Sequence, residues 1–197
     1  MNQFITHQIK ASIEVKQAIL ADAAVLATIQ QAAAAAIKAY RNGHKLLLAG
    51  NGGSAGDAQH IAGEMVNRFR FDRTALPAVS LAADTSVLTA IGNDSSFEQV
   101  FARQIEALGA SGDVFIGIST SGKSPNIIRA LQTCEKKKII RIGFTGQGGG
   151  EMAPYCDHCV AVPSRETPRI QEAHILIAHI FCALVEEDLF GKGFATS

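Results

Sequence analysis

Residues 45–66, KLLLAGNGGSAGDAQHIAGEMV, decide the fold of this chain. They begin with the apolar run Lys45–Ala49, which has the length and composition of a buried strand. A loop rich in glycine, residues 50–54, follows, and residues 55 to about 68 have the pattern of a helix. A strand that leads through such a loop directly into a helix is typical of a parallel α/β sheet.

The same order recurs further along the chain. Short runs with β-branched residues predict more strands, at 78–82, 114–118, 139–144 and 159–162. Helical stretches follow these strands, at 86–91, at about 124–137, just after a loop at 146–150, and at about 167–190. Strands that alternate with helices in this way predict an α/β fold whose parallel sheet is covered on both faces.

Residues 2–42 precede the first strand and contain neither proline nor glycine. Ile5, Ile9 and Ile13 recur at helical spacing, a break near Asp22 divides the segment into two helices, and Asn42-Gly43 ends the second. We expect one domain over residues 1–197. Within it, the helices of residues 1–43 lie outside the main layers as an oligomer contact, and residues 44–197 form the α/β core.

The composition limits the classes of protein to which the chain can belong. Hydrophobic residues make up 47% of the 197 positions, which is ordinary for a globular chain. Lys+Arg and Asp+Glu are equal at 18 each, so no basic excess directs the chain to nucleic acid or to an anionic membrane. The N-terminus does not resemble a signal peptide, and no apolar stretch reaches the roughly 18 residues that span a bilayer. We therefore expect a soluble, cytoplasmic protein.

The four cysteines are Cys134, Cys156, Cys159 and Cys182, and without an export signal they favour reduced thiols. The segment Cys156-Asp157-His158-Cys159 could suggest a zinc or redox site. A zinc finger would need a second pair of ligands, and none stands at a useful spacing. Two half-buried thiols at a turn that enters a strand are the favoured interpretation.

Two loops of the predicted sheet are suited to anions. Residues 119–124, STSGKS, offer hydroxyl groups and backbone N–H groups at the start of a helix, where the helix dipole favours phosphate. The loop is not a Walker A motif, because the GxxxxGK[ST] spacing is absent. Residues 50–54 do not match GxGxxG either, since Ala55 occupies the third glycine position. Ligands of parallel sheets bind beyond the carboxyl ends of the strands, where both loops are expected.

Two helices carry groups that could act on a ligand. His60 and Glu64 stand four residues apart and share one helix face, where they could bind a divalent metal or place a base beside a metal ligand. The last helix adds Gln171, Glu172, His174 and His179 in an apolar stretch, where histidines are more often core residues than ligands. Gln171 and His179 are separated by about 12 Å along a straight helix, so both side chains would have to stretch to bind the same metal ion. Asn93-Asp94 follows a glycine after the 86–91 helix and could equally be a turn.

Taken together, the segments 50–54, 57–60, 92–94, 112–114, 119–122 and 169–172 resemble those of the bacterial phosphoheptose isomerase family, the sedoheptulose 7-phosphate isomerases of the sugar isomerase (SIS) domain class. The resemblance covers nearly the whole chain. It implies a flavodoxin-like three-layer α/β/α sandwich with a five-stranded parallel sheet, and a homotetramer with active sites at subunit boundaries. The implied reaction converts D-sedoheptulose 7-phosphate to D-glycero-D-manno-heptose 7-phosphate, toward ADP-heptose and the lipopolysaccharide core.

The resemblance also implies site residues. The family's substrate contacts fall on Asn51, Gly52, Gly53, Ser54, Glu64, Asn93, Asp94, Ser119, Thr120, Ser121, Ser124 and Gln171. Its zinc ligands, for one Zn²⁺ per subunit, fall on His60, Glu64, Gln171 and His179. Lys123 departs from the pattern, because a small polar residue is common there.

For the implied reaction we expect Glu64 to act as the base and His179 as its acid partner, with the metal polarising or orienting the sugar oxygens. The separation of Gln171 and His179 then requires either a ligand from a neighbouring subunit or an irregular helix. Two other functions share this fold and stay open: a non-catalytic SIS protein that binds the DnaA replication initiator, and a sugar-phosphate-sensing module. The complete set of His60, Glu64, Gln171 and His179 favours the enzyme over the initiator-binding protein.

Overall fold

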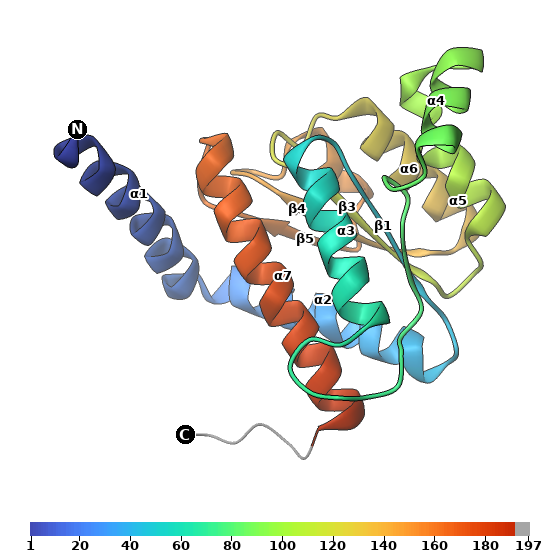
Figure 1. Ribbon diagram of the computed structural model, residues 1–197, viewed down its shortest axis with the longest axis horizontal. Helices are drawn as coiled ribbons and strands as arrows, with labels where there is room; N and C mark the ends of the chain where they lie inside the picture. The colour runs from blue at the N-terminus through green and yellow to red at the C-terminus, as the bar shows by residue number, and fades with distance from the viewer. Residues whose placement is uncertain (192–197) are drawn as a thin grey trace.

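The computed structural model describes residues 1–191 (Figure 1). The strands are β1 Leu46–Gly50, β2 Ala78–Ser80, β3 Val114–Ser119, β4 Ile140–Thr145 and β5 His158–Ala161. The helices are α1 Asn2–Ala21, α2 Ala23–Arg41, α3 Gly53–Val66, α4 Thr85–Asp94, α5 Ala102–Leu108, α6 Pro125–Lys137 and α7 Thr167–Phe190, with short 3₁₀ helices η1 Phe97–Gln99 and η2 Gly150–Tyr155. The strands of these residues form one parallel sheet in the order β2-β1-β3-β4-β5, which confirms the predicted fold class.

The sheet is buried between two helical layers. Leu46 and Leu48 of β1 pack in the core on the side of α2, α3 and α7, whereas Leu47 and Ala49 pack on the side of α5 and α6. Because successive side chains of a strand point to opposite faces, a strand covered on both sides needs an unbroken apolar run. Residues Leu46–Gly50 form such a strand, and the architecture is a three-layer α/β/α sandwich.

The register brings the carboxyl ends of three strands to one edge of the sheet. Gly50 of β1 pairs with Ile118 of β3, and Ser119 pairs with Thr145 of β4. The loops that follow β1, β3 and β4 therefore begin side by side. The candidate site lies at this edge.

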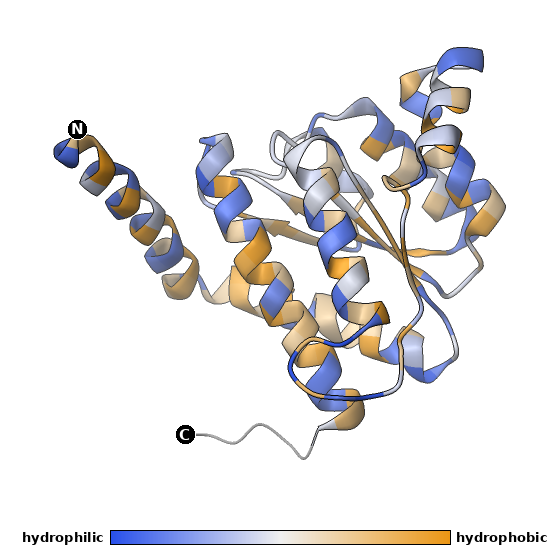
Figure 2. Cartoon of the chain, viewed as in Figure 1, coloured by the Kyte–Doolittle hydropathy of each residue, from blue (hydrophilic) through white to orange (hydrophobic). Residues whose placement is uncertain are grey.

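The N-terminal helices form the predicted pair. Asp22 is the N-cap of α2, and its Oδ1 accepts hydrogen bonds from the N–H groups of Ala24 at 2.9 Å and Val25 at 3.2 Å. The two helices are bent by 79° at this residue (Figure 1). Helix α1 extends outward, and Arg169 of α7 donates to the carbonyl of Gln8 on it. Figure 2 shows alternating apolar and polar patches along α1. Within residues 1–191, no single helix has the length and apolar character needed to cross a membrane.

Some segments differ from the prediction. Helix α4 continues to Asp94, so Asn93 and Asp94 form its last turn instead of following it. The short elements η1 and α5 were not predicted at all. All four cysteines are free, with Cys134 and Cys182 buried and Cys156 and Cys159 half-buried, as the favoured interpretation of this pair expected.

Candidate active site

The loop after β1 is joined to the start of α6 by a pair of amides. Asn51 Nδ2 donates to Asn126 Oδ1 at 2.9 Å, and Asn126 Nδ2 donates to Asn51 Oδ1 at the same distance. Asn126 is buried, so this reciprocal pair fixes one loop against the other.

The serine loop ends at a helix N-terminus that no side chain caps. The hydroxyl groups of Ser119 and Ser124 are hydrogen-bonded to each other at 2.8 Å, and Ser124, the N-cap of α6, makes no side-chain bond to the first turn. The first N–H groups of a helix have no partner within the helix and attract anions. This end of α6 is therefore a suitable place for a phosphate.

Glycine allows the serine loop to approach the loop after β4. Gly122 has a φ of +64°, and a Cβ there would lie 2.4 Å from the carbonyl oxygen of Gly149. The N–H of Met152 donates to the carbonyl of Gly122 at 2.9 Å. The glycine-rich loop at 146–150 thus acts as a support behind the serine loop.

Three predicted residues meet between α3 and α7. His60 Nε2 lies 2.9 Å from His179 Nε2 and 3.4 Å from Glu64 Oε1. The ring of Phe69 stacks on His179, with centroids 5.5 Å apart and an angle of 24° between the planes. A carboxylate and two imidazoles can transfer protons or bind a metal, and here they come together from helices far apart in sequence.

Gln171 lies nearer the start of α3. A Cβ on Gly53 would be only 2.6 Å from Gln171 Nε2, so the absence of a side chain at Gly53 leaves room for this amide. Helix α7 is continuous from Thr167 to Phe190, so the idea of an irregular helix between Gln171 and His179 is wrong.

The donor atoms suit zinc, although the shell is not formed. In a tetrahedral shell with Zn–N of about 2.1 Å, two nitrogen donors lie about 3.4 Å apart. The 2.9 Å between His60 and His179 and the 3.4 Å between His60 and Glu64 are close to that spacing. Within residues 1–191, however, no three His, Cys, Asp or Glu side chains already stand as a metal-binding group. The 2.9 Å between the two imidazole nitrogens is shorter than the spacing of two ligands in a shared zinc shell.

Asp57 lies one turn before His60 on α3, and sequence reasoning did not select it as a site residue. Its Oδ2 atom is buried and has no hydrogen-bond partner. Burial raises the pKa of Asp57, and the nearby His60 opposes that shift. An orphaned carboxylate oxygen beside His60 adds a possible acceptor to this part of the site.

Other predicted residues are not brought into these contacts. Asn93 and Asp94 are exposed on α4, where their side chains bond only to each other, at 2.8 Å. Ser54 is buried in the first turn of α3, whereas Gly52, Thr120 and Ser121 are at least partly exposed along the loops. His174 is a core residue, as its apolar surroundings suggested: Nε2 lies 3.1 Å from the carbonyl oxygen of Thr145.

A hollow lies elsewhere on the chain. It has a volume of about 440 Å³ and is lined by Lys38, Lys138, Arg141, Asp157 and His158, among others. These residues lie around the start of β4, at the opposite end of the sheet from the serine loop. The hollow is therefore separate from the groups that could carry out chemistry.

Sequence reasoning missed Asn126 and Phe69 as well as Asp57. Asn126 directly follows the proline that starts α6, a position where a buried amide signals a loop contact. Nothing in the sequence around Phe69 indicated a contact with His179, which lies 110 positions further along the chain (179 − 69).

Comparison with known proteins identifies the family of the chain. The SIS domain family matches residues 10–146. Phosphoheptose isomerase of Aneurinibacillus thermoaerophilus is 60% identical over 100% of this chain and 99% of its own length. Phosphoheptose isomerase 2 of Campylobacter jejuni is 59% identical over 99% of this chain and 97% of its own length. The structure of phosphoheptose isomerase from Neisseria gonorrhoeae superimposes with a TM-score of 0.89 at 40% identity, covering 94% of this chain and 98% of that one. By sequence and by fold, the chain belongs to the SIS domain family and, within it, to the phosphoheptose isomerases.

Proposed function

We propose that this chain converts D-sedoheptulose 7-phosphate to D-glycero-D-manno-heptose 7-phosphate through an enediol. The observation that carries the proposal is the meeting of Glu64, His60 and His179, with Glu64 Oε1 and His179 Nε2 both within 3.4 Å of His60 Nε2. Family membership supplies the class of substrate, and these side chains supply groups for the proton transfers.

The substrate phosphate binds at the start of α6. Pro125 begins this helix and has no N–H, and the N–H groups of Ile127 and Ile128 donate to the carbonyl of Ser124. The anion is therefore bound by the N–H of Asn126, by the helix dipole and by the hydroxyl groups of residues 119–124. The pair Asn51–Asn126 holds the neighbouring loop beside the anion. Substrate binding involves Asn51, Gly52, Gly53, Ser119, Thr120, Ser121 and Ser124.

The isomerisation moves one proton between two carbons. Glu64 removes the proton from C1 of the ketose and returns it to C2. His179 donates a proton to the oxygen on C2, and accepts one from the oxygen on C1 as the aldehyde forms. The charge that develops on these oxygens requires stabilisation by nearby donors, for which Gln171 is a candidate.

Zinc would be held by His60, Glu64 and His179. Because α7 is continuous, Gln171, the fourth predicted ligand, would come from a neighbouring subunit. When bound, zinc supplies a positive charge that polarises or orients the oxygens on C1 and C2. The support for this assignment is the spacing of the three donors and the unpartnered oxygen of Asp57 near them.

We further propose that the chain acts in the cytoplasm as a homotetramer, with active sites completed at subunit boundaries, and that its product leads toward ADP-heptose and lipopolysaccharide core heptose. The exposed apolar face of α1 supports the tetramer, because such a face on a projecting helix is well suited to packing against another copy.

The test is incubation with sedoheptulose 7-phosphate, with and without added zinc, while the aldose product is measured. Glu64→Gln should lower kcat by about 10²- to 10⁴-fold, the usual contribution of a general base, and leave binding of the sugar phosphate largely intact. Glu106→Gln is a matched control, because Glu106 is exposed on α5 and pairs with Arg103. Near-normal turnover by Glu64→Gln would refute the choice of base. Binding without turnover in the wild type would favour a sensing or initiator-binding role.

A further inference from the structure

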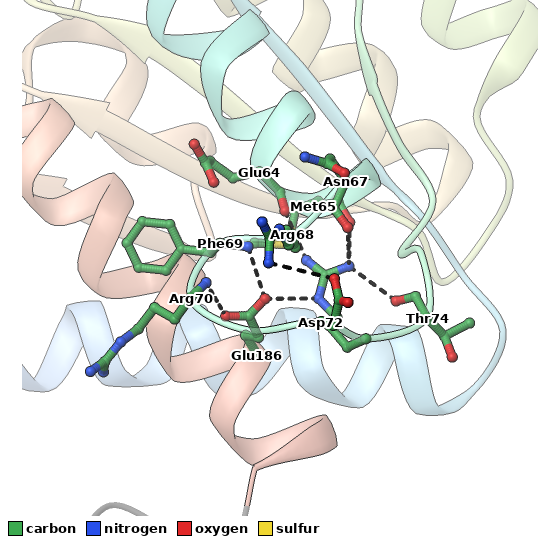
Figure 3. Close-up of polar contacts among 10 residues, drawn as sticks. Glu64, Met65, Asn67, Arg68, Phe69, Arg70, Asp72, Thr74 and Glu186 are labelled. Atoms are coloured by element: carbon green, nitrogen blue, oxygen red, sulfur yellow. Dashed lines mark hydrogen bonds and ion pairs between the residues drawn. The ribbon is translucent and has the colours of Figure 1, made fainter.

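A buried arginine, Arg73, contacts the end of α3, where the carbonyl of Met65 also accepts from the N–H of Leu76 at 3.1 Å. The last carbonyl groups of a helix have no partner within the helix. Arg73 supplies donors to two of them: Nη2 donates to the carbonyl of Glu64 at 2.8 Å, and Nη1 to that of Met65 at 2.7 Å. Nη1 also lies 3.0 Å from the carbonyl of Thr74 (Figure 3). The backbone of the proposed base is thus held directly by the guanidinium group.

The charge of Arg73 is balanced by a carboxylate from another helix. Glu186 Oε1 accepts a hydrogen bond from Arg73 Nε at 3.0 Å, and each of the two side chains is only 1% exposed. A buried charge requires such a partner, since an isolated ion in the core is strongly unfavourable. The loop between Asn67 and Thr74 is therefore fastened to α7.

Glu186 also holds the backbone of this loop. Its Oε1 accepts from the N–H of Phe69 at 2.9 Å, and its Oε2 accepts from the N–H of Arg70 at 2.7 Å (Figure 3). Burial alone raises the pKa of Glu186, but these hydrogen bonds and Arg73 lower it below its usual value, so the carboxylate stays charged. These bonds place Phe69 where its ring stacks on His179.

Glu186 and His179 are seven residues apart on α7, so both lie on the helix face toward α3. Arg73, Glu186 and the loop that they hold thus form one cluster. Arg73 contacts the carbonyl of Glu64 at one end of this cluster, and Phe69 contacts the ring of His179 at the other. We propose that Glu186 and Arg73 are positioning residues for the isomerisation, and that their ion pair sets the distance between the base and its acid partner. The inference rests on the proposed function, because it assigns a role in that reaction.

The experiment compares four variants with the wild type. Glu186→Gln keeps the shape of the side chain but turns one acceptor into a donor, which faces the N–H groups of the loop or Arg73. Arg73→Lys keeps the charge and loses the planar fork that reaches both carbonyls. Asp188→Asn is the matched control, since Asp188 lies two residues further on the same helix and forms an exposed pair with Arg41 at 2.6 Å.

We expect kcat to fall about 10- to 100-fold in Glu186→Gln and Arg73→Lys, as for other small misplacements of reacting groups. The KM for sedoheptulose 7-phosphate and the Kd for inorganic phosphate should change less than about twofold, because the serine loop is not part of the cluster. Asp188→Asn should match the wild type. Normal kcat in Glu186→Gln, or an equal loss in Asp188→Asn, would overturn the inference.

The double variant Arg73→Met with Glu186→Met separates positioning from stability. Replacing both members of a buried ion pair by apolar residues often preserves or improves stability. The double variant removes both buried charges together and should therefore still fold. Its melting temperature should fall by several degrees and its kcat should stay low, because the carbonyl of Glu64 and the N–H of Phe69 lose their partners. Recovery of kcat together with the melting temperature would show a purely structural role and overturn the inference. An inactive wild type would instead refute the proposed function itself.

Discussion

At the scale of single residues, His174 makes the stability of the folded protein depend on pH. It is 1% exposed, with one ring nitrogen 3.1 Å from the carbonyl oxygen of Thr145 and the other buried without a partner. Burial lowers the pKa of His174 to about 4, which the hydrogen bond to Thr145 only partly offsets. The unfolded chain, where the pKa is about 6.5, binds a proton at this residue before the folded chain does.

The native protein should therefore lose stability as the pH falls from about 6.5 to 4, by about 3 kcal/mol from this residue when the loss is complete. His174→Gln removes the titration, so its free energy of unfolding should fall less over this range, even if it is lower at pH 7. Urea unfolding at pH 7 and pH 5 measures the difference. His7→Gln, at an exposed position of α1, is the control. Parallel pH dependences in wild type and His174→Gln would contradict the assignment.

Residue types and spacing identified only part of the site. The pair His60 and Glu64 could be chosen because both lie on one predicted helix, and His179 followed from the family resemblance. Asn126 and Glu186 could not, because their partners lie 75 and up to 117 positions away in the chain. Such contacts depend on how α6 and α7 pack, which the local pattern does not contain.

At the scale of elements, the glycines of α3 should respond differently to the same substitution. Gly53→Ala would place a methyl group 2.6 Å from Gln171 Nε2, whereas Gly56→Ala would meet no atom within 4 Å. We expect Gly53→Ala to displace the Gln171 amide and to lower kcat/KM by about tenfold, since misplaced contacts of this kind reduce turnover.

Gly56→Ala serves as the control on the same helix. It should leave turnover unchanged and stabilise the fold by about 0.5–1 kcal/mol, the usual gain for alanine over glycine in a helix. Steady-state kinetics and urea unfolding measure both effects. Equal kinetic losses in the two variants would show that the contact between Gly53 and Gln171 has no part in the reaction.

The predicted elements were most accurate where periodicity was strong. The strands at 114–118 and 139–144 agree within one residue with β3 and β4, because their apolar runs are buried on both faces. The segment from 95 to 108 was left without structure, since η1 and α5 are only three and seven residues long. Helices that short present too few turns for an apolar stripe to be recognised.

At the scale of the whole molecule, the projecting helix α1 carries the prediction on assembly. Ile5, Ile9 and Ile13 are 52%, 56% and 47% exposed, and their spacing places them on one face. If this face holds the tetramer together, Ile9→Asp combined with Ile13→Asp should shift the protein to smaller species, because buried carboxylates without partners are strongly unfavourable.

Sedimentation velocity measures the mass of these species. His7→Asp is the control, because residue 7 is exposed about 160° around the helix from Ile5 and Ile9. An unchanged mass in the double variant would exclude this face as the contact. Loss of turnover together with the change in mass would support active sites at subunit boundaries.

The amide pair of Asn51 and Asn126 has a consequence for the chemical ageing of the protein. Asn51 precedes Gly52, and an asparagine in this context is prone to deamidation, because glycine does not hinder attack by the next backbone nitrogen on the side-chain amide. The reciprocal hydrogen bonds hold that amide in place, and an aspartate there would face Asn126 Oδ1 with an acceptor instead of a donor. A stored preparation that deamidates at Asn51 will therefore acquire a negative charge beside the start of α6, and will lose affinity for phosphate before it loses its fold.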